Sequence, residues 1–229
     1  FLIDEWTPGS GIASAVGLPL LDGDDTAVVF SALHRLGYHD LDVEAVLSYK
    51  SAFNFKCYPL ESDPSTSTNV HVLDALRRVL PAGHDGIQTA LNFLRRTRTA
   101  RAYWLDKWHA SPYYPTSHAV IALEGLDDQM ALEAVDWILS TQWEDGSWGW
   151  YRPTAEETAY ALRALALWGI RKEDDVPASA LSDAYRWLEA HATDPHPPLW
   201  IGKCLYTPRI PVEAAVLSAQ RLAKMAIPL

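Results

Sequence analysis

The sequence predicts an all-α protein. Apolar residues recur at helical spacing along most of the chain, whereas the alternation of apolar and polar residues typical of strands is almost absent. Short loops rich in Pro, Gly and Asp separate the periodic segments. Several of these segments are flanked by the same kind of turn, which favours a repeat of helical hairpins over a simple bundle.

The periodicity indicates eight helices. The first follows a run of acidic residues and ends before Gly37, and the second ends before Pro81, which cannot continue a helix. Loops at 81–83 and 124–127 separate later helices, and the acidic triplet 173–175 is expected to be a solvated loop. The expected helices are 26–36, 67–80, 87–96, 117–123, 129–141, 154–168, 178–190 and 212–224.

The composition is that of a globular chain with an aromatic core. The 229 residues could form one large domain or two small ones, and 48% of them are hydrophobic, with ten Trp and ten Tyr. A net charge of −10 without a basic stripe argues against a nucleic-acid partner. No apolar run approaches the roughly 20 residues of a membrane span, and no signal peptide opens the chain. We therefore expect a cytoplasmic protein with Cys57 and Cys204 as reduced thiols.

One acidic run is a candidate for proton chemistry. Asp22, Asp24 and Asp25 place three carboxyls in four positions, directly before an apolar helical segment. Mutual repulsion should make at least one of them hold its proton more tightly, and a protonated carboxyl is a candidate general acid. Because Asp is also favoured at helix starts, an acidic N-cap explains the spacing equally well. A proton held against a helix dipole in a dry site suits protonation of an alkene, a very weak base.

A second motif precedes the helix expected at 154–168. Gln142, Gly146 and Trp148 form a Gln-x-x-x-Gly-x-Trp pattern at the end of the preceding helix. Gln142 can bond the backbone at the start of the next helix while Trp148 stacks on it. We interpret this motif as a structural staple in preference to a ligand contact.

Together, these two motifs resemble those of the class II terpene cyclases, which include squalene-hopene cyclase and the copalyl diphosphate synthases. Residues 22–27 look like the Asp-x-Asp-Asp-Thr-Ala motif of that family, and 142–148 like its Gln/Trp repeat. The similarity runs from about Leu18 to the C-terminus. Further segments look like the bacterial diterpene branch: 63–73, 107–118, 154–162 and 199–206.

The resemblance implies an incomplete α/α barrel, the β domain of these cyclases, over most of residues 1–229. In the family a helical γ domain packs against this domain, and the substrate lies between the two. Because the chain begins with Phe1, we expect a piece of a longer protein that lacks the γ domain and the upstream helix of the β domain. The Mg²⁺ that accompanies the substrate diphosphate would be bound in that missing part, so no metal site is expected here.

The resemblance also assigns catalytic roles. The family's general acid is the middle Asp of its motif, which falls on Asp24, and Asp22 and Asp25 would tune its acidity. A polar partner of this acid falls on His71, within a His-Val-Leu sequence. An imidazole there can stabilise the carboxylate that remains after proton transfer. Asn69 should point to another face of the helix and is a weaker candidate.

Aromatic side chains in the family-like segments are candidates to line the cavity, because their faces stabilise a carbocation without offering a lone pair. Most aromatic residues of a helical domain are core, so only two or three should reach the substrate. Lys203 and His118 could face its polar end, although a packing role is equally plausible. Gly23 should loosen the backbone before the acid. The aromatic candidates are Tyr113, Tyr114, Trp148, Trp200 and Tyr206.

The leading hypothesis is proton-initiated cyclisation of geranylgeranyl diphosphate. Asp24 would protonate the terminal alkene, two rings would close, and a base would remove a proton while the diphosphate is retained. The product would be a bicyclic copalyl diphosphate, with the ent form as the best guess.

Other hypotheses remain open. A C15 or C30 substrate, or a halimadienyl- or labdadienyl-type product, would belong to the same class, although a single Gln/Trp repeat favours C20. A helical-barrel glycoside hydrolase could pair Asp24 with Glu156 or Glu157. A protein prenyltransferase subunit would need zinc ligands, and an isolated domain could be an inert scaffold. The deprotonating base and the oligomeric state are not predicted.

Overall fold

The computed structural model describes residues 1–227, and the chain folds into two compact units. The first unit ends at Thr97 and the second begins at Arg98. Helices account for most of the described residues, and the all-α prediction is confirmed apart from one short hairpin. Cys57 is a buried free thiol and Cys204 an exposed one, as expected.

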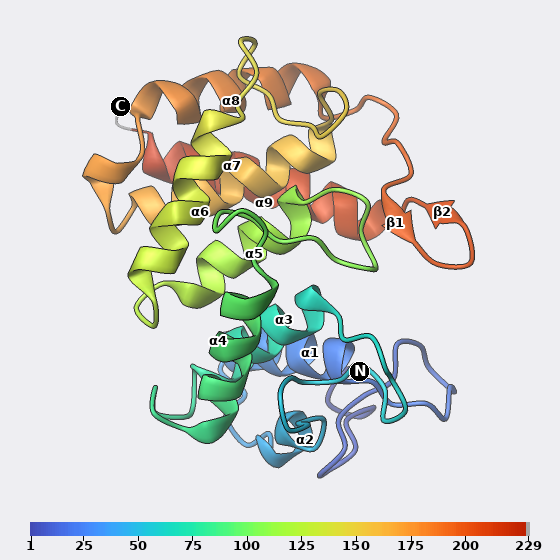
Figure 1. Cartoon of the computed structure of the whole chain (residues 1–229). Coiled ribbons are helices and arrows are strands. Elements are labelled where there is room, and N and C mark those ends of the chain that lie inside the picture. The colour runs from blue at the N-terminus through green and yellow to red at the C-terminus, as the bar shows by residue number, and fades with distance from the viewer. Residues whose placement is uncertain (228–229) are drawn as a thin grey trace. The chain divides into compact units, whose positions relative to one another are not determined.

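The first unit is built on a buried helix. Its helices, in blue to green in Figure 1, are α1 (Gly23–Arg35), α2 (Glu44–Leu47), α3 (Thr66–Leu76) and α4 (Asp85–Thr97). Helix α3 packs against both α1 and α4, and every residue of α3 except Asp74 is buried. This burial explains why α3 carries small hydroxyl and aliphatic side chains and almost no charge.

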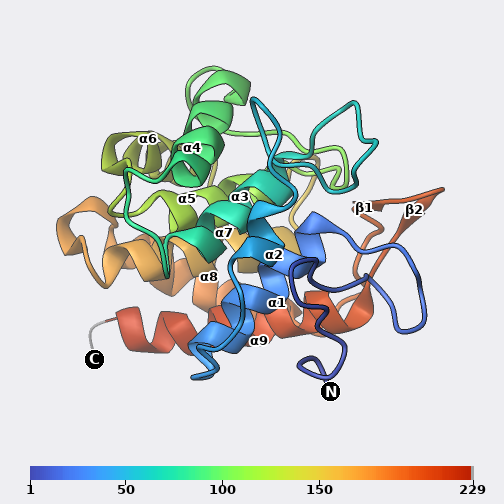
Figure 2. The ribbon, with the colours of Figure 1, turned by 90° about the horizontal axis from the view of Figure 1, so that it is seen from below.

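The second unit packs around α7. Its helices are α5 (Tyr113–Leu123), α6 (Asp128–Ser140), α7 (Ala155–Gly169), α8 (Ala178–His191) and α9 (Arg209–Ala226), with a 3₁₀ turn at Glu173–Asp175. Helix α7 contacts α5, α8 and α9. The strands β1 (Trp200–Ile201) and β2 (Leu205–Tyr206) form an antiparallel hairpin that protrudes beside the start of α9 (Figure 1 and Figure 2).

All eight expected helices are present, with differences at their ends. The helix expected at 67–80 ends at Leu76, and separate turns lead on to Pro81. Helix α5 begins four residues earlier than expected because Pro115 lies in its first turn, where a missing N–H costs nothing. The single-turn helix α2 and the hairpin were missed, since each is too short to produce a periodic pattern.

Side-chain caps begin several of these helices. Ser65, Asp127 and Thr154 each accept a hydrogen bond from the backbone N–H three residues on, at 3.1 Å. These caps satisfy donors that the first helical turn leaves without partners. The starts of α3, α6 and α7 are therefore encoded locally.

The motif at 142–148 is a staple, as predicted, but it reaches a different helix. Gln142 Nε2 donates to the carbonyls of Gly146 at 2.9 Å and Ala180 at 3.0 Å, so it holds the first turn of α8 and not that of α7. The fully buried Trp148 donates from Nε1 to the Ile138 carbonyl of α6 at 2.7 Å. The motif thus connects α6 to α8.

Among residues 1–227, no helix combines the length and the apolar character that are needed to cross a bilayer.

The staple predicts a specific loss of stability. Replacing Gln142 with Ala leaves the carbonyls of Gly146 and Ala180 without this donor. We expect the free energy of unfolding to fall by about 1–2 kcal/mol, measured by urea denaturation. Gln88→Ala is the matched control, because Gln88 Nε2 donates one hydrogen bond, to the exposed carbonyl of Ala82, and does not join two helices. Equal losses for the two variants would contradict a stapling role.

Candidate active site

The acidic run lies at the start of α1, and its first member is the helix cap. Asp22 has extended backbone angles, and its Oδ1 accepts a hydrogen bond from Asp25 N at 2.8 Å. Asp24 and Asp25 occupy the first turn. The capping interpretation is therefore correct for Asp22, and it leaves the other two carboxyls available for other contacts.

Asp24 pairs with the predicted histidine. Asp24 Oδ1 lies 2.8 Å from His71 Nδ1, which is carried by α3. The His71 ring is largely buried, whereas 28% of the Asp24 side chain is exposed. A carboxyl that contacts an imidazole on one side and is open on another has the geometry that a proton donor needs.

Asp22 is the most deeply buried of the three carboxyls. Its side chain is 1% exposed, and among the described residues no group donates a hydrogen bond to its Oδ2. Burial, followed by repulsion from Asp25, raises its pKa to about 8. The repulsion argument from the sequence predicted that at least one of the three acids would hold its proton more tightly but did not say which.

The pKa of Asp25 is raised as well. Burial is the main cause, and a hydrogen bond with the Asp22 side chain opposes the rise. Two carboxyls held this close disfavour each other's ionisation. Burial also raises the pKa of the Cys57 thiol to about 12, so the sulfur that lies 3.9 Å from Asp22 Oδ1 is neutral.

Gly23 holds this cluster tightly, and the expectation that it loosens the backbone was wrong. It is buried, and its N–H donates to the Cys57 carbonyl at 2.8 Å. A Cβ at this position would lie 2.5 Å from the Lys56 carbonyl oxygen and 2.8 Å from Tyr49 Cγ. Glycine is therefore needed for close approach of two backbones and not for flexibility.

Asn69 has a structural role. Its Oδ1 accepts from Phe55 N at 2.8 Å, and its Nδ2 donates to the carbonyls of Phe55 and Ser65 at 2.9 and 2.8 Å. The side chain is fully buried. It fixes the loop around Phe55 against α3, which agrees with its low rank as a catalytic candidate.

A second buried carboxyl organises the other unit. Glu156 Oε1 accepts hydrogen bonds from Trp200 Nε1 at 2.8 Å, Tyr160 Oη at 3.1 Å and His109 Nε2 at 3.2 Å. Glu156 is fully buried and His109 nearly so. Neither His109 nor Tyr160 was assigned a role from the sequence. Both lie in family-like segments, which is the only sequence signal that could have singled them out.

The predicted substrate-binding residues fall into two groups. Tyr113, Tyr114 and Trp148 are buried, and Tyr114 stacks on His109 and packs edge-on against Trp200, with ring centroids 4.9 and 4.8 Å apart. Trp200 is half-buried on β1. Tyr206 on β2 and Lys203 in the hairpin turn are exposed. Contact of these residues with a substrate stays a prediction.

His118 is engaged within the second unit. Its ring lies 4.6 Å from that of Tyr114, and its Nε2 lies 3.2 Å from an Arg163 nitrogen. These contacts match the packing alternative that the sequence left open.

The two glutamates of the glycoside hydrolase alternative support the local fold. Glu157 Oε2 accepts from the Thr154 hydroxyl at 2.7 Å, and its Oε1 accepts from Trp150 N at 2.9 Å. Glu156 holds the three donors described above, and both residues are buried. The presence of these two carboxyls, on which the glycoside hydrolase alternative depended, is therefore explained by their hydrogen bonds within the fold.

Within the described part of the chain, no group of three or more His, Cys, Asp or Glu side chains is placed to hold a metal ion. The described residues thus do not by themselves form a Mg²⁺ site. Binding of Mg²⁺ outside this chain stays a prediction.

Comparisons with known proteins agree on one family. The family model for the squalene-hopene cyclase C-terminal domain matches residues 36–164. A type B diterpene cyclase of Mycobacterium tuberculosis is 42% identical over 224 residues, which cover 95% of this chain and 44% of the relative. An ent-copalyl diphosphate synthase of a Streptomyces strain is 38% identical to this chain. The alignment covers 94% of this chain and 44% of that relative.

A solved structure shows the same fold. The ent-copalyl diphosphate synthase from Streptomyces platensis matches 99% of this chain with a TM-score of 0.80 and 35% identity, over 45% of its own length. The predicted helical fold of the terpene cyclases is thereby confirmed. The chain spans less than half the length of each of these relatives.

The raised pKa of Asp22 predicts how stability depends on pH. Between the pKa of an unfolded Asp, about 4, and the folded value of about 8, the folded chain keeps a proton that the unfolded chain has lost. The stability that Asp22 contributes is therefore complete below about pH 4 and is lost as the pH rises toward 8.

Asp22→Asn should remove this pH dependence, because Asn still caps the helix but carries no charge. We expect the variant to gain about 3–4 kcal/mol relative to the native chain between pH 5 and pH 8 in urea denaturation. Asp127→Asn, at the cap of α6, is the control and should follow the native slope. An unchanged slope for Asp22→Asn would show that this carboxyl is ionised in the folded chain.

Gly23→Ala should disturb the cluster. The added methyl meets backbone at Lys56, which cannot move aside as a flexible side chain would. We expect a loss of about 2 kcal/mol or more in the free energy of unfolding, measured by urea denaturation. Gly83→Ala is the control, since no described atom lies within 4 Å of the position that its added methyl would take. A Gly23→Ala variant as stable as this control would contradict the close approach.

Proposed function

The chain belongs to the squalene-hopene cyclase family, within the class II diterpene cyclases, and we propose that it cyclises geranylgeranyl diphosphate with Asp24 as the general acid. The observation that carries this proposal is the 2.8 Å contact between Asp24 and His71 at the start of α1. The reaction is an isomerisation that retains the diphosphate.

The proton balance of the reaction is simple. Asp24 gives its proton to the terminal alkene, so that a C–H bond forms and a tertiary carbocation remains. Two further alkenes attack in turn and form two C–C bonds, and loss of a proton from the last cation restores neutrality. A base other than Asp24 takes that proton, and Asp24 must be reprotonated before the next turnover.

The environment separates Asp24 from its two neighbours. Asp22 is sealed from solvent and burial raises its pKa, whereas Asp24 is partly open and contacts His71. The His71 imidazole would stabilise the carboxylate that Asp24 becomes. Because burial raises the pKa of both Asp22 and Asp25, these neighbours would repel that carboxylate less than two freely ionised carboxyls would. These two acids therefore tune the donor.

The aromatic residues that the family-like segments carry would stabilise the cation. Tyr113, Tyr114, Trp148, Trp200 and Tyr206 are the candidates, and Lys203 would face the polar end of the substrate. The substrate would bind with help from a γ domain, and Mg²⁺ would neutralise the diphosphate with ligands outside this chain. The cytoplasm would be the site of action.

The product is proposed to be a bicyclic copalyl diphosphate, with the ent form favoured by the names of two relatives. A second candidate is another product of the same class. A labda-7,13-dienyl diphosphate synthase of Streptomyces clavuligerus is 36% identical over 96% of this chain, which supports that alternative.

Asp24→Asn should abolish turnover while the chain stays folded, because Asn has no proton of comparable acidity to give. His71→Gln should lower kcat by about 100-fold or more, since a hydrogen bond remains but the ionisable partner is lost. Incubation of the full-length protein with C15, C20 and C30 prenyl substrates, followed by mass spectrometry of the products, measures both effects and the substrate length.

Asp40→Asn is the control, because Asp40 lies in an exposed loop of the same unit. Full activity of Asp24→Asn would refute the assignment of the acid. A bicyclic diphosphate formed from the C20 substrate alone would support the chain length that we propose.

A further inference from the structure

A cavity of the second unit is lined by charged side chains of both signs. It measures about 390 Å³, which falls within the size range of small-molecule sites. The turn that enters α7, the last part of α8 and the loop after α8 surround it. Three prolines contribute apolar wall, and the charged and aromatic lining residues are Arg152, Trp187, His191 and Asp194.

The guanidinium and the carboxylate of this cavity are both unused. Arg152 and Asp194 are exposed, and within residues 1–227 neither side chain forms an ion pair or a hydrogen bond. The two residues therefore do not neutralise each other, although they line the same small cavity. A ligand could bind each of them without displacing an internal partner.

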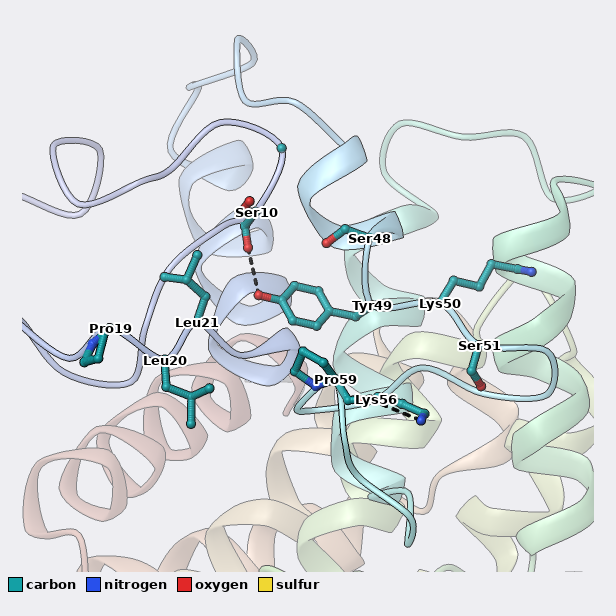
Figure 3. Close-up of a pocket in the computed structure, with 11 residues that line it drawn as sticks. Ser10, Pro19, Leu20, Leu21, Ser48, Tyr49, Lys50, Ser51, Lys56 and Pro59 are labelled. Carbon is teal, nitrogen blue, oxygen red and sulfur yellow. Dashed lines mark hydrogen bonds between the residues drawn. The ribbon is translucent and has the colours of Figure 1, made fainter.

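A cavity of the first unit shows the contrast (Figure 3). It is lined by Lys50 and Lys56 but by no acidic residue. Both ammonium groups already have partners, since Lys50 Nζ pairs with Asp85 Oδ2 at 2.8 Å and Lys56 Nζ donates to the Pro59 carbonyl at 3.3 Å. Unused charges of both signs thus distinguish the cavity beside α8 from this one.

Two stacked rings form one wall of the cavity beside α8. Trp187 and His191 lie one helical turn apart, with ring centroids separated by 4.1 Å and an interplanar angle of 12°. Trp187 Nε1 donates to Asp145 Oδ2 at 3.0 Å, and His191 Nδ1 donates to the Trp187 carbonyl at 2.8 Å. Both rings are therefore held before a ligand binds, and a further flat ring can continue their stack.

The backbone that carries the two charges is also fixed. A Cβ on Gly149 would lie 1.7 Å from the Arg152 carbonyl oxygen, so this glycine allows the turn before α7 to close. On the other side, Thr207 Oγ1 donates to the Pro197 carbonyl at 3.1 Å, and the prolines among residues 195–198 restrict the loop after Asp194. Rigid segments on both sides lower the entropy cost of binding.

We propose that this cavity binds a zwitterion of the amino acid class with an aromatic side chain. Arg152 would hold the carboxylate through paired hydrogen bonds, and Asp194 would accept from the ammonium. The ring of the ligand would stack on Trp187 and His191.

The opposite signs of the two free groups are what select a zwitterion. A purely anionic ligand would bind Arg152 but would meet Asp194 as a like charge, and a purely cationic ligand would meet Arg152 in the same way. A ligand that is neutral overall is also not repelled by a chain with a net charge of −10.

This site is separate from the predicted proton donor. Its two charged residues and its two stacked rings lie outside the segments that resemble the diterpene cyclases, whereas Asp24 and His71 belong to the first unit. Binding of a zwitterion goes beyond the cyclisation reaction and does not depend on whether Asp24 is the acid.

Four small molecules test each contact on the native full chain by titration calorimetry. L-Phenylalanine carries both charges and a ring, whereas phenylpropionate lacks the ammonium, phenylethylamine lacks the carboxylate and L-alanine lacks the ring. We expect each analogue with a single charge to bind about fivefold more weakly than L-phenylalanine, and L-alanine about tenfold more weakly. Equal affinities of the three aromatic compounds, or no binding of L-phenylalanine, would overturn the proposal.

Two charge variants assign the contacts. Arg152→Gln should weaken L-phenylalanine about fivefold without weakening phenylethylamine, which has no carboxylate to lose. Asp194→Asn should weaken L-phenylalanine to a similar extent without weakening phenylpropionate. Arg209→Gln and Asp174→Asn are the matched controls, because both are exposed charges of the same unit that do not line the cavity. Unchanged binding of L-phenylalanine by both cavity variants would contradict the site.

The stacked wall is tested by Trp187→Leu, which removes one ring and keeps an apolar side chain on α8. We expect about tenfold weaker binding of L-phenylalanine and little change for L-alanine. Tyr185→Leu is the control, since Tyr185 is an aromatic residue of the same helix that does not line the cavity. Urea denaturation verifies that both variants fold. Equal losses for the two ligands in Trp187→Leu would show that no ring stacks there and would overturn the proposal.

Discussion

The burial of the Asp22 carboxyl is the constraint on which the start of α1 and the whole acidic cluster depend. One oxygen caps the helix by accepting from Asp25 N, and the other is sealed from solvent. A buried carboxyl without a counter-ion keeps its proton, and here it can pass a hydrogen bond to Asp25. With the helix start fixed in this way, Asp24 is directed toward His71 on α3. Three chemically identical side chains thereby acquire three different environments.

The loop at 55–57 connects this cluster to the rest of the first unit. Asn69 fixes it to α3 through Phe55, and the Cys57 carbonyl accepts a hydrogen bond from Gly23 N. The absence of a side chain at Gly23 allows this loop to pack closely against the start of α1.

The second unit also contains a buried carboxyl, that of Glu156. A fully buried carboxyl is tolerated there because His109, Tyr160 and Trp200 all donate to one of its oxygens. These bonds join α7 to the β1 strand and to the loop that precedes α5. The hairpin that carries Lys203 and Tyr206 is thus anchored to α7 through Trp200.

The sequence by itself determined the eight longer helices, the acidic cap of the first one and the family, because periodicity and capping act within one or two turns and the motifs are contiguous. It also supplied the pairing of Asp24 with His71 through the resemblance. Only the tertiary structure decided which acid holds the proton, why residue 23 must be Gly, and what His109 and Glu156 do. Each of these depends on groups far apart in the chain, such as Glu156 and Trp200, 44 residues apart. Local pattern carries no information on burial produced by such contacts, and burial is what distinguishes Asp22 from Asp24.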